Sequence, residues 1–162
     1  MKLAEALQQR ADINNKITKL REKMENNVLV QEGEKPDFDI AKLIEEHDEL
    51  TEERTKLIDQ INWTNIHTSD EETEKSIAEL ITYRDELKTK MSTYQTIIDK
   101  IGEKRWRTSG SEIKTISTIK AKDIQKKYDE AAKLFRQIDN KIQMLNWATD
   151  LEDPDIELEV IE

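Results

Sequence analysis

Apolar side chains recur at alternating spacings of three and four residues along most of this 162-residue chain. Because an α-helix turns once in about 3.6 residues, that spacing places them on one stripe of a helix. The pattern covers four segments, at about residues 2–27, 40–64, 71–101 and 121–148. It is most regular in the fourth segment, where the stripe consists of Ile124, Tyr128, Ala131, Phe135, Ile138, Ile142 and Leu145. The sequence therefore predicts four helices, each about 40 Å long.

The connections between these segments indicate how the helices pair. Val28–Asp39 (VLVQEGEKPDFD) contains a glycine and a proline, and Asn65–Asp70 (NIHTSD) is a polar turn. Short connections make the helices on either side antiparallel neighbours. The third connection is longer, and its β-branched residues from Ile113 to Ile119 predict a short β-prone stretch before the fourth helix. We expect an all-α fold in one domain of residues 1–149, either an elongated antiparallel four-helix bundle or paired coiled-coil-like helical hairpins.

Composition fits narrow helical stripes better than a thick core. Charged residues make up 38% of the chain and hydrophobic residues 35%, whereas the usual apolar share is about 45–50%. Narrow stripes also favour self-association, because pairing covers flanks that a single chain leaves in water. The expected partners are therefore a second copy, giving a homo-oligomer, or another protein.

Charge and cysteine content exclude several classes of function. The net charge is −10, and residues 150–162 form an acidic tail with seven acids and no base. A sequence-independent DNA or RNA binder needs a basic face, so an acidic chain gives no strong signal for nucleic-acid binding. The absence of cysteine excludes disulfides, thiolate metal sites and a cysteine nucleophile. No run approaches the ~20 apolar residues of a membrane span, and the N-terminus lacks the apolar stretch of a signal peptide. We expect a soluble cytoplasmic protein without a transmembrane segment.

Two similar stretches, INWTN and LNWAT, end the second and fourth segments. Counting levels along antiparallel helices places Trp63 and Trp147 at the end of the bundle that holds the N-terminus. Trp106 falls at the opposite end. Trp63 and Trp147 each follow the last residue of their stripe by two positions, about 200° around a helix, so on a continuing helix their rings would point away from the core.

These tryptophans have three interpretations. Asn62 or Asn65, together with Asn146, help to end the helices, and each ring then folds over a helix end. Alternatively the exposed rings form an oligomer contact, since tryptophan is enriched in interface hot spots. A small-ligand pocket is the third interpretation.

Three arginines lie on the predicted stripes. The same level count brings Arg10, Arg54 and Arg84 together, with Arg54 opposite Asn15 and Asp139 as a neighbour. Buried arginines must be paired or hydrogen-bonded. They either form ion pairs that fix the helix register or reach outward to water. As a functional alternative, they bind an anionic ligand or the carboxylates of a partner.

Two kinds of metal site that occur in all-helical proteins can be compared with the sequence. A ferritin-type iron site uses Glu-x-x-His pairs, but Ile44 and Thr64 stand three residues before the two histidines. All-helical nucleotide pyrophosphohydrolases hold magnesium with Glu-x-x-Glu followed by Glu-x-x-Asp. The acids with that spacing here are Glu22, Glu25, Glu45 and Asp48. Their phase puts them on the outer helix faces, so we expect no metal and no cofactor and keep this enzyme as an alternative.

A basic aromatic stretch, Lys104–Arg107 (KRWR), is of the kind that binds phosphates or single strands. It is equally typical of a solvated loop or of a partner for the acidic tail. The chain contains no Gly-rich phosphate loop and no nucleophile elbow.

Several stretches together resemble a known family. They are MKLAEAL and RAD near the start, VQEGEKP in the first loop, GSEIKTISTI before the fourth helix and IDNKIQMLNW at its end. They are similar to a bacterial family of short uncharacterised proteins, some of which carry the label septicolysin, over about residues 1–150. The resemblance implies a small helical bacterial protein with no catalytic residues to carry over, and the label implies a membrane-damaging toxin.

The function hypothesis that follows is a non-enzymatic protein that self-associates and acts through protein contacts. The alternatives are the magnesium-dependent nucleotide pyrophosphohydrolase and a membrane-active, cytolysin-like protein. No catalytic residues are expected.

Overall fold

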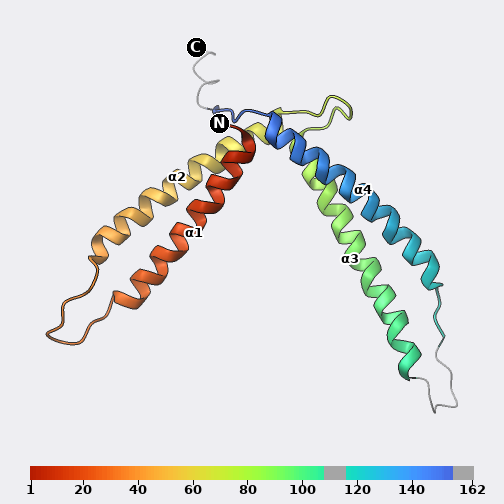
Figure 1. The fold of residues 1–162 in the computed structure, drawn as a ribbon, viewed down its shortest axis with the longest axis horizontal. Coiled ribbons are helices and arrows are strands. Elements are labelled where there is room, and N and C mark those ends of the chain that lie inside the picture. Colours follow the sequence, from red (N-terminus) through yellow and green to blue (C-terminus); the bar gives the residue numbers. More distant parts are fainter. Residues whose placement is uncertain (108–115, 155–162) are drawn as a thin grey trace. The chain divides into compact units, whose positions relative to one another are not determined.

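The computed structural model describes residues 1–107 and 116–154, except for the side chains of residues 104–107. Its helices are α1 (Leu3–Asn27), α2 (Ile40–His67), α3 (Ile77–Arg107) and α4 (Ala121–Ala148) (Figure 1). The predicted all-α fold is confirmed. Within the described ranges no strand forms, and residues 116–119 of the predicted β-prone stretch are irregular; its first residues, 113–115, lie outside the described residues.

The third helix begins at Ile77, six residues later than the spacing of apolar side chains indicated. The preceding residues form a turn in which the Thr73 amide and hydroxyl both donate to Asp70 Oδ2, at 2.8 and 2.6 Å. Ser76 then caps the helix: its amide donates to Glu79 Oε2 at 2.8 Å, and the Glu79 amide donates to Ser76 Oγ at 3.2 Å. This reciprocal pair is a capping box, which fixes the helix start independently of apolar spacing.

The chain divides into two compact units. The first unit consists of Met1–Ser69 and Leu145–Glu162, and the second consists of Asp70–Met144. The first unit therefore holds the α1–α2 hairpin and the end of α4. The second unit holds α3 and the rest of α4, which also lie side by side (Figure 1).

The α1–α2 hairpin of the first unit is held by one narrow apolar seam. The buried residues of these helices are Leu3, Ala6, Ile13, Leu20, Leu43, Leu57, Ile61 and Thr64. Polar contacts flank the seam: Gln9 Nε2 donates to Glu53 Oε1 at 3.1 Å, and Arg54 donates to Asn14 Oδ1 at 3.3 Å. Only four of the 25 residues of α1 are buried, so most of the surface of this helix faces water.

The second unit has a similar seam, but charged pairs flank it. Its buried apolar residues are Ile77, Leu80, Leu87, Ile124, Ala131, Ala132 and Ile142. Arg84 of α3 pairs with Asp139 of α4 at 3.5 Å. Two residues further along α4, Lys141 pairs with Asp70 at 3.0 Å and with Glu72 at 2.6 Å.

The beginning of the predicted acidic tail packs on the first unit. The Leu3 amide donates to the Thr149 carbonyl at 3.0 Å, and the Leu151 amide donates to the Met1 carbonyl at 2.8 Å. Lys2 Nζ also pairs with Asp150 at 3.0 Å. The two ends of the first unit are therefore held together by an isolated antiparallel bridge between Lys2 and Asp150. Tail residues 155–162 lie outside the described residues.

Candidate protein-contact surface

Trp63 lies inside α2 and not at its end. The helix continues to His67, and the Thr68 amide caps it by donating to the Thr64 carbonyl at 3.0 Å. The prediction that Asn62 or Asn65 ends this helix, with the ring folded over the end, is therefore wrong. Instead the half-buried Trp63 ring stacks on His67, with centroids 4.0 Å apart. Its buried Nε1 has no hydrogen-bond partner within the described part of the chain.

Trp147 behaves as the phase of the helix predicted. It lies on the last turn of α4, and 63% of its surface is exposed. The neighbouring Asn146 is buried, because it continues the inward stripe from Ile142. Trp106 is part of α3, but its side chain lies outside the described residues.

A groove lined mainly by residues of α1, with Glu53 of α2, lies beside Trp147. It has a volume of about 540 Å³. Its apolar lining comes from Met1, Ala4, Ile13 and Trp147, and its polar lining includes Gln8, Gln9, Glu53 and Lys16. Met1 is itself more than half exposed. Large apolar side chains that rim a concave surface are typical of a protein contact, since tryptophan and methionine are enriched at interfaces.

The three stripe arginines divide between the two units. Arg10 and Arg54 are half-buried in the first unit, and the partner of Arg54 is Asn14, one residue from the predicted Asn15. Arg54 Nε is buried and has no hydrogen-bond partner among the described residues. Within its own unit, Arg84 has the neighbour that the level count predicted, Asp139.

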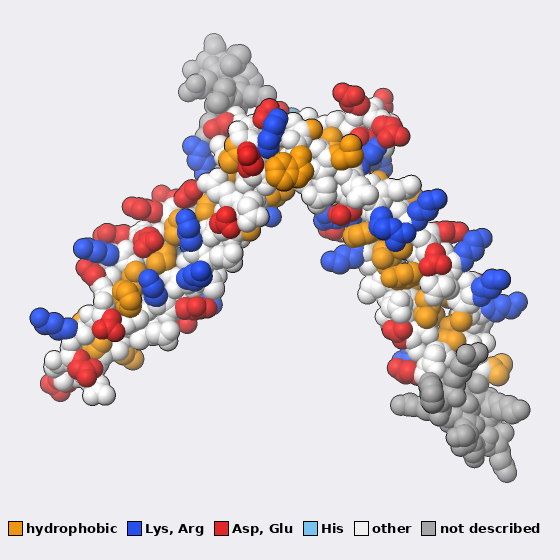
Figure 2. All heavy atoms as spheres, viewed as in Figure 1, with side chains coloured by type: hydrophobic (Ala, Val, Ile, Leu, Met, Phe, Trp, Pro, Cys, Tyr) orange, Lys and Arg blue, Asp and Glu red, His pale blue; other side chains and the backbone are white. Residues whose placement is uncertain are grey.

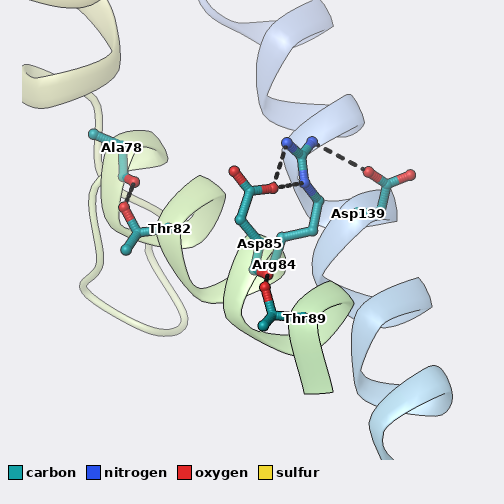
Figure 3. A network of polar contacts seen from close by, with 6 residues as sticks. All are labelled: Ala78, Thr82, Arg84, Asp85, Thr89 and Asp139. Atoms are coloured by element: carbon teal, nitrogen blue, oxygen red, sulfur yellow. Dashed lines mark hydrogen bonds and ion pairs between the residues drawn. The ribbon is translucent and has the colours of Figure 1, made fainter. Parts of the chain in front are cut away.

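Arg84 is held by two carboxylates on one side of the second unit (Figure 3). Its Nη2 lies 3.1 Å from Asp85 Oδ1, and its Nη1 lies 3.5 Å from Asp139 Oδ1. The guanidinium is thus already neutralised within the unit. An ion pair that fixes helix register describes this residue better than an anion site.

The four acids of the alternative magnesium site are all exposed. Two of them contact neighbours on their own helices: Glu25 pairs with Arg21 at 3.4 Å, and Asp48 lies 3.0 Å from His47 Nδ1. Across the residues that the structure describes, no group of three or more His, Asp or Glu side chains is close enough to hold a metal ion.

Two polar residues that the sequence analysis did not single out are structurally important. Thr64 is fully buried, and its hydroxyl donates to the Gln60 carbonyl at 2.8 Å and accepts from the Glu152 amide at 3.0 Å. Its position three residues after Ile61 on the stripe could have indicated burial. Asp70 is the second, and hydrogen bonds from the Thr73 hydroxyl and then from Lys141 hold its pKa below the usual value.

The fold alone places the protein in a structural class. This is an all-α protein of two units, each of which contains a pair of helices with a narrow apolar seam. None of its described helices is both long and apolar enough to cross a membrane.

The chain belongs to a family of unknown function (DUF6847), whose model matches residues 10–151. It is also similar to a crystal structure described as a functionally unknown conserved protein from Corynebacterium diphtheriae. The two are 37% identical with a TM-score of 0.87, and the match covers 94% of this chain and 99% of that chain. A comparison with curated proteins finds no match.

Proposed function

We propose that this protein is a non-enzymatic cytoplasmic protein that self-associates and acts through protein–protein contacts. The observation that carries the proposal is the exposed Trp147 ring, which stands with Met1 at the rim of a groove on α1. Exposing a tryptophan to water is unfavourable for an isolated chain, and a partner that covers it gains both apolar burial and specificity. The narrow seams support the self-association, since each hairpin leaves its outer faces uncovered.

Sedimentation velocity over a range of concentrations tests the self-association. We expect a mass above the 19.1 kDa of one chain, rising with concentration. A monomer at every concentration would contradict this part of the proposal.

Co-purification from the native cell tests the Trp147 surface. Wild-type protein should retain at least one partner that the Trp147→Ser variant loses. Ile66→Ser is the matched control, because Ile66 is 61% exposed on α2 of the same unit but does not line the groove. Equal recovery of partners by wild type and Trp147→Ser would exclude this surface as the contact.

The two alternatives are tested on the same preparations. The magnesium-dependent hydrolase would release phosphate or pyrophosphate from nucleoside triphosphates, and it would lose that activity in Glu22→Gln. The membrane-active protein implied by the septicolysin label would release dye from liposomes. Catalytic hydrolysis of nucleotides, or dye release at stoichiometric amounts of protein, would contradict our proposal and support the corresponding alternative.

A further inference from the structure

The α1–α2 loop carries an exposed apolar cluster with an acidic rim. We call this loop, Val28–Asp39, the tip. Its exposed apolar residues are Val28, Leu29, Val30 and Phe38, and Leu29 is 86% exposed. Four acids and one lysine accompany them in the sequence VLVQEGEKPDFD. Apolar side chains this exposed at the end of a hairpin are typical of a contact that one chain does not complete.

The tip has a defined conformation. Gly33 has φ of 94°, in the left-handed region that favours glycine, and the Glu34 amide donates to the Gln31 carbonyl at 3.0 Å. Lys23 of α1 lies over the Phe38 ring, 4.9 Å from its centroid. A loop that already has its turn and one aromatic side chain anchored loses less entropy when it binds.

The second unit carries an apolar groove at the far end of α3. We call it the end groove; its volume is about 260 Å³, and its apolar lining is Ile97, Ile101, Ile116 and Ile119. Ile116 is 78% exposed. The Ser117 hydroxyl bonds to the Ile119 carbonyl at 2.6 Å and so helps to shape this wall of the groove. Lys100 also lines the groove, and Lys120 follows its last residue.

The charges around these two surfaces are opposite. Residues 32–59 contain eleven acids and four bases, a net charge of −7, whereas residues 116–144 contain seven bases and four acids, a net charge of +3. Figure 2 shows lysine and arginine side chains along the α4 side of the second unit. Opposite fields of this size attract the two surfaces at a distance and favour one orientation of encounter.

We propose that the tip of one chain docks in the end groove of a second copy. This inference rests on the self-association proposed above and names the surfaces that produce it. The tip supplies aliphatic side chains with an acidic rim, and the end groove supplies an aliphatic lining with a basic surround. One sequence thus carries both halves of a complementary pair. Because the two surfaces differ, the contact is heterologous, and repeating it generates a closed ring or an open chain of copies.

Two single variants test the docking. Leu29→Asp places a charge in the tip, and Ile116→Asp places one in the end groove; both residues are highly exposed, so the fold is preserved, which circular dichroism checks. In sedimentation velocity each variant should associate at least about 10-fold more weakly than wild type, because burying a charge removes the apolar gain. Ile66→Asp is the control, because Ile66 is also an exposed aliphatic residue, at 61%, but lies outside both surfaces; this variant should associate like wild type.

Mixing the two variants gives the decisive result. The Leu29→Asp chain keeps an intact end groove and the Ile116→Asp chain keeps an intact tip, so the mixture should form a complex of two chains and nothing larger. A mixture that remains monomeric overturns the docking. If wild type associates and both variants associate equally well, the docking fails while the proposed self-association stands. If wild type is a monomer, both fail.

Charge reversal provides a second test. A Glu34→Lys and Asp37→Lys double variant keeps the apolar tip but reverses its rim, so the association of this variant with itself should be weaker than that of wild type. Wild-type association should also weaken between about 50 mM and about 500 mM salt, because salt screens exposed charges. If wild type and the double variant associate equally well, and salt does not weaken either association, the charged rims have no role in the docking.

Discussion

The two units use the same building element, a pair of long helices with one narrow seam, but they are closed differently. In the first unit the seam is flanked by the Gln9–Glu53 and Arg54–Asn14 hydrogen bonds and closed by backbone pairing with the segment after α4. In the second unit, ion pairs of Arg84 and Lys141 join the elements. The net charges also differ, −12 for the first unit and +2 for the second, which together give −10. Similar apolar seams can therefore be stabilised either by backbone hydrogen bonds to a segment distant in the sequence or by ion pairs within the unit.

The largest expected effect is the loss of stability when a buried leucine is removed from the seam of one unit and not from that of the other. Leu3 and Leu80 are both fully buried, one in each unit, and Leu→Ala at such sites costs about 2–5 kcal/mol of folding free energy. Leu3→Ala should loosen α1 and α2, and Leu80→Ala should loosen α3 and α4. Amide hydrogen exchange measured segment by segment checks this. If either variant speeds exchange equally in both hairpins, the units unfold together and the comparison fails.

A smaller effect is expected from removing the closing segment. Deleting residues 150–162 removes the Leu151–Met1 and Glu152–Thr64 hydrogen bonds, which should destabilise the first unit by about 1–3 kcal/mol. Exchange at the Leu3 end of α1 should rise while α3 is unchanged. Deleting only residues 155–162 is the control and should leave exchange in the first unit as it is in the full chain. Identical protection in both deletions would show that the pairing contributes nothing.

The smallest effect is a pH dependence in the second unit. The hydrogen bond from Thr73, and then that from Lys141, lowers the pKa of Asp70 below its ordinary value of 3.8. A carboxylate with a lowered folded pKa stabilises the fold above its unfolded pKa, and this stability is lost as pH falls through the folded pKa. Protection of the α3 start should therefore decrease below about pH 4. Asp70→Asn should flatten that decrease, with the amides of the first unit in the same samples as reference. If protection of the α3 start falls with pH as steeply in Asp70→Asn as in wild type, Asp70 is not the cause of this pH dependence.

Apolar spacing predicted the helices, because burial of one stripe is what defines each of them. It did not locate the start of α3, where Asp70, Thr73 and Ser76 set the turn and the cap through side-chain hydrogen bonds. Nor did it place the end of α2, since Asn62 or Asn65 was expected to end the helix near residue 64, whereas the helix continues to His67 and is capped by the Thr68 amide. Stripe width also does not distinguish a hairpin seam from a four-helix core, because both bury about the same few positions per turn.

The candidate surfaces were partly accessible from the sequence. The phase count correctly turned Trp147 away from the core, and the level count found the Arg84–Asp139 neighbours. The Trp63–His67 stack was missed because it depends on a helix that continues past Asn65. The exposed tip and the end groove were missed as well, since an apolar residue in a loop does not by itself reveal whether it is covered.

The closing bridge between Lys2 and Asp150 has a consequence for synthesis of the protein on the ribosome. Synthesis proceeds from the N-terminus to the C-terminus, so α1 and α2 are made before the second unit, whereas the residues that complete their own unit are made after it. Every residue of the second unit leaves the ribosome before Glu152 can reach Thr64. The hairpin that is translated first is thus completed only after the second unit has been made, when the segment that follows α4 pairs with it.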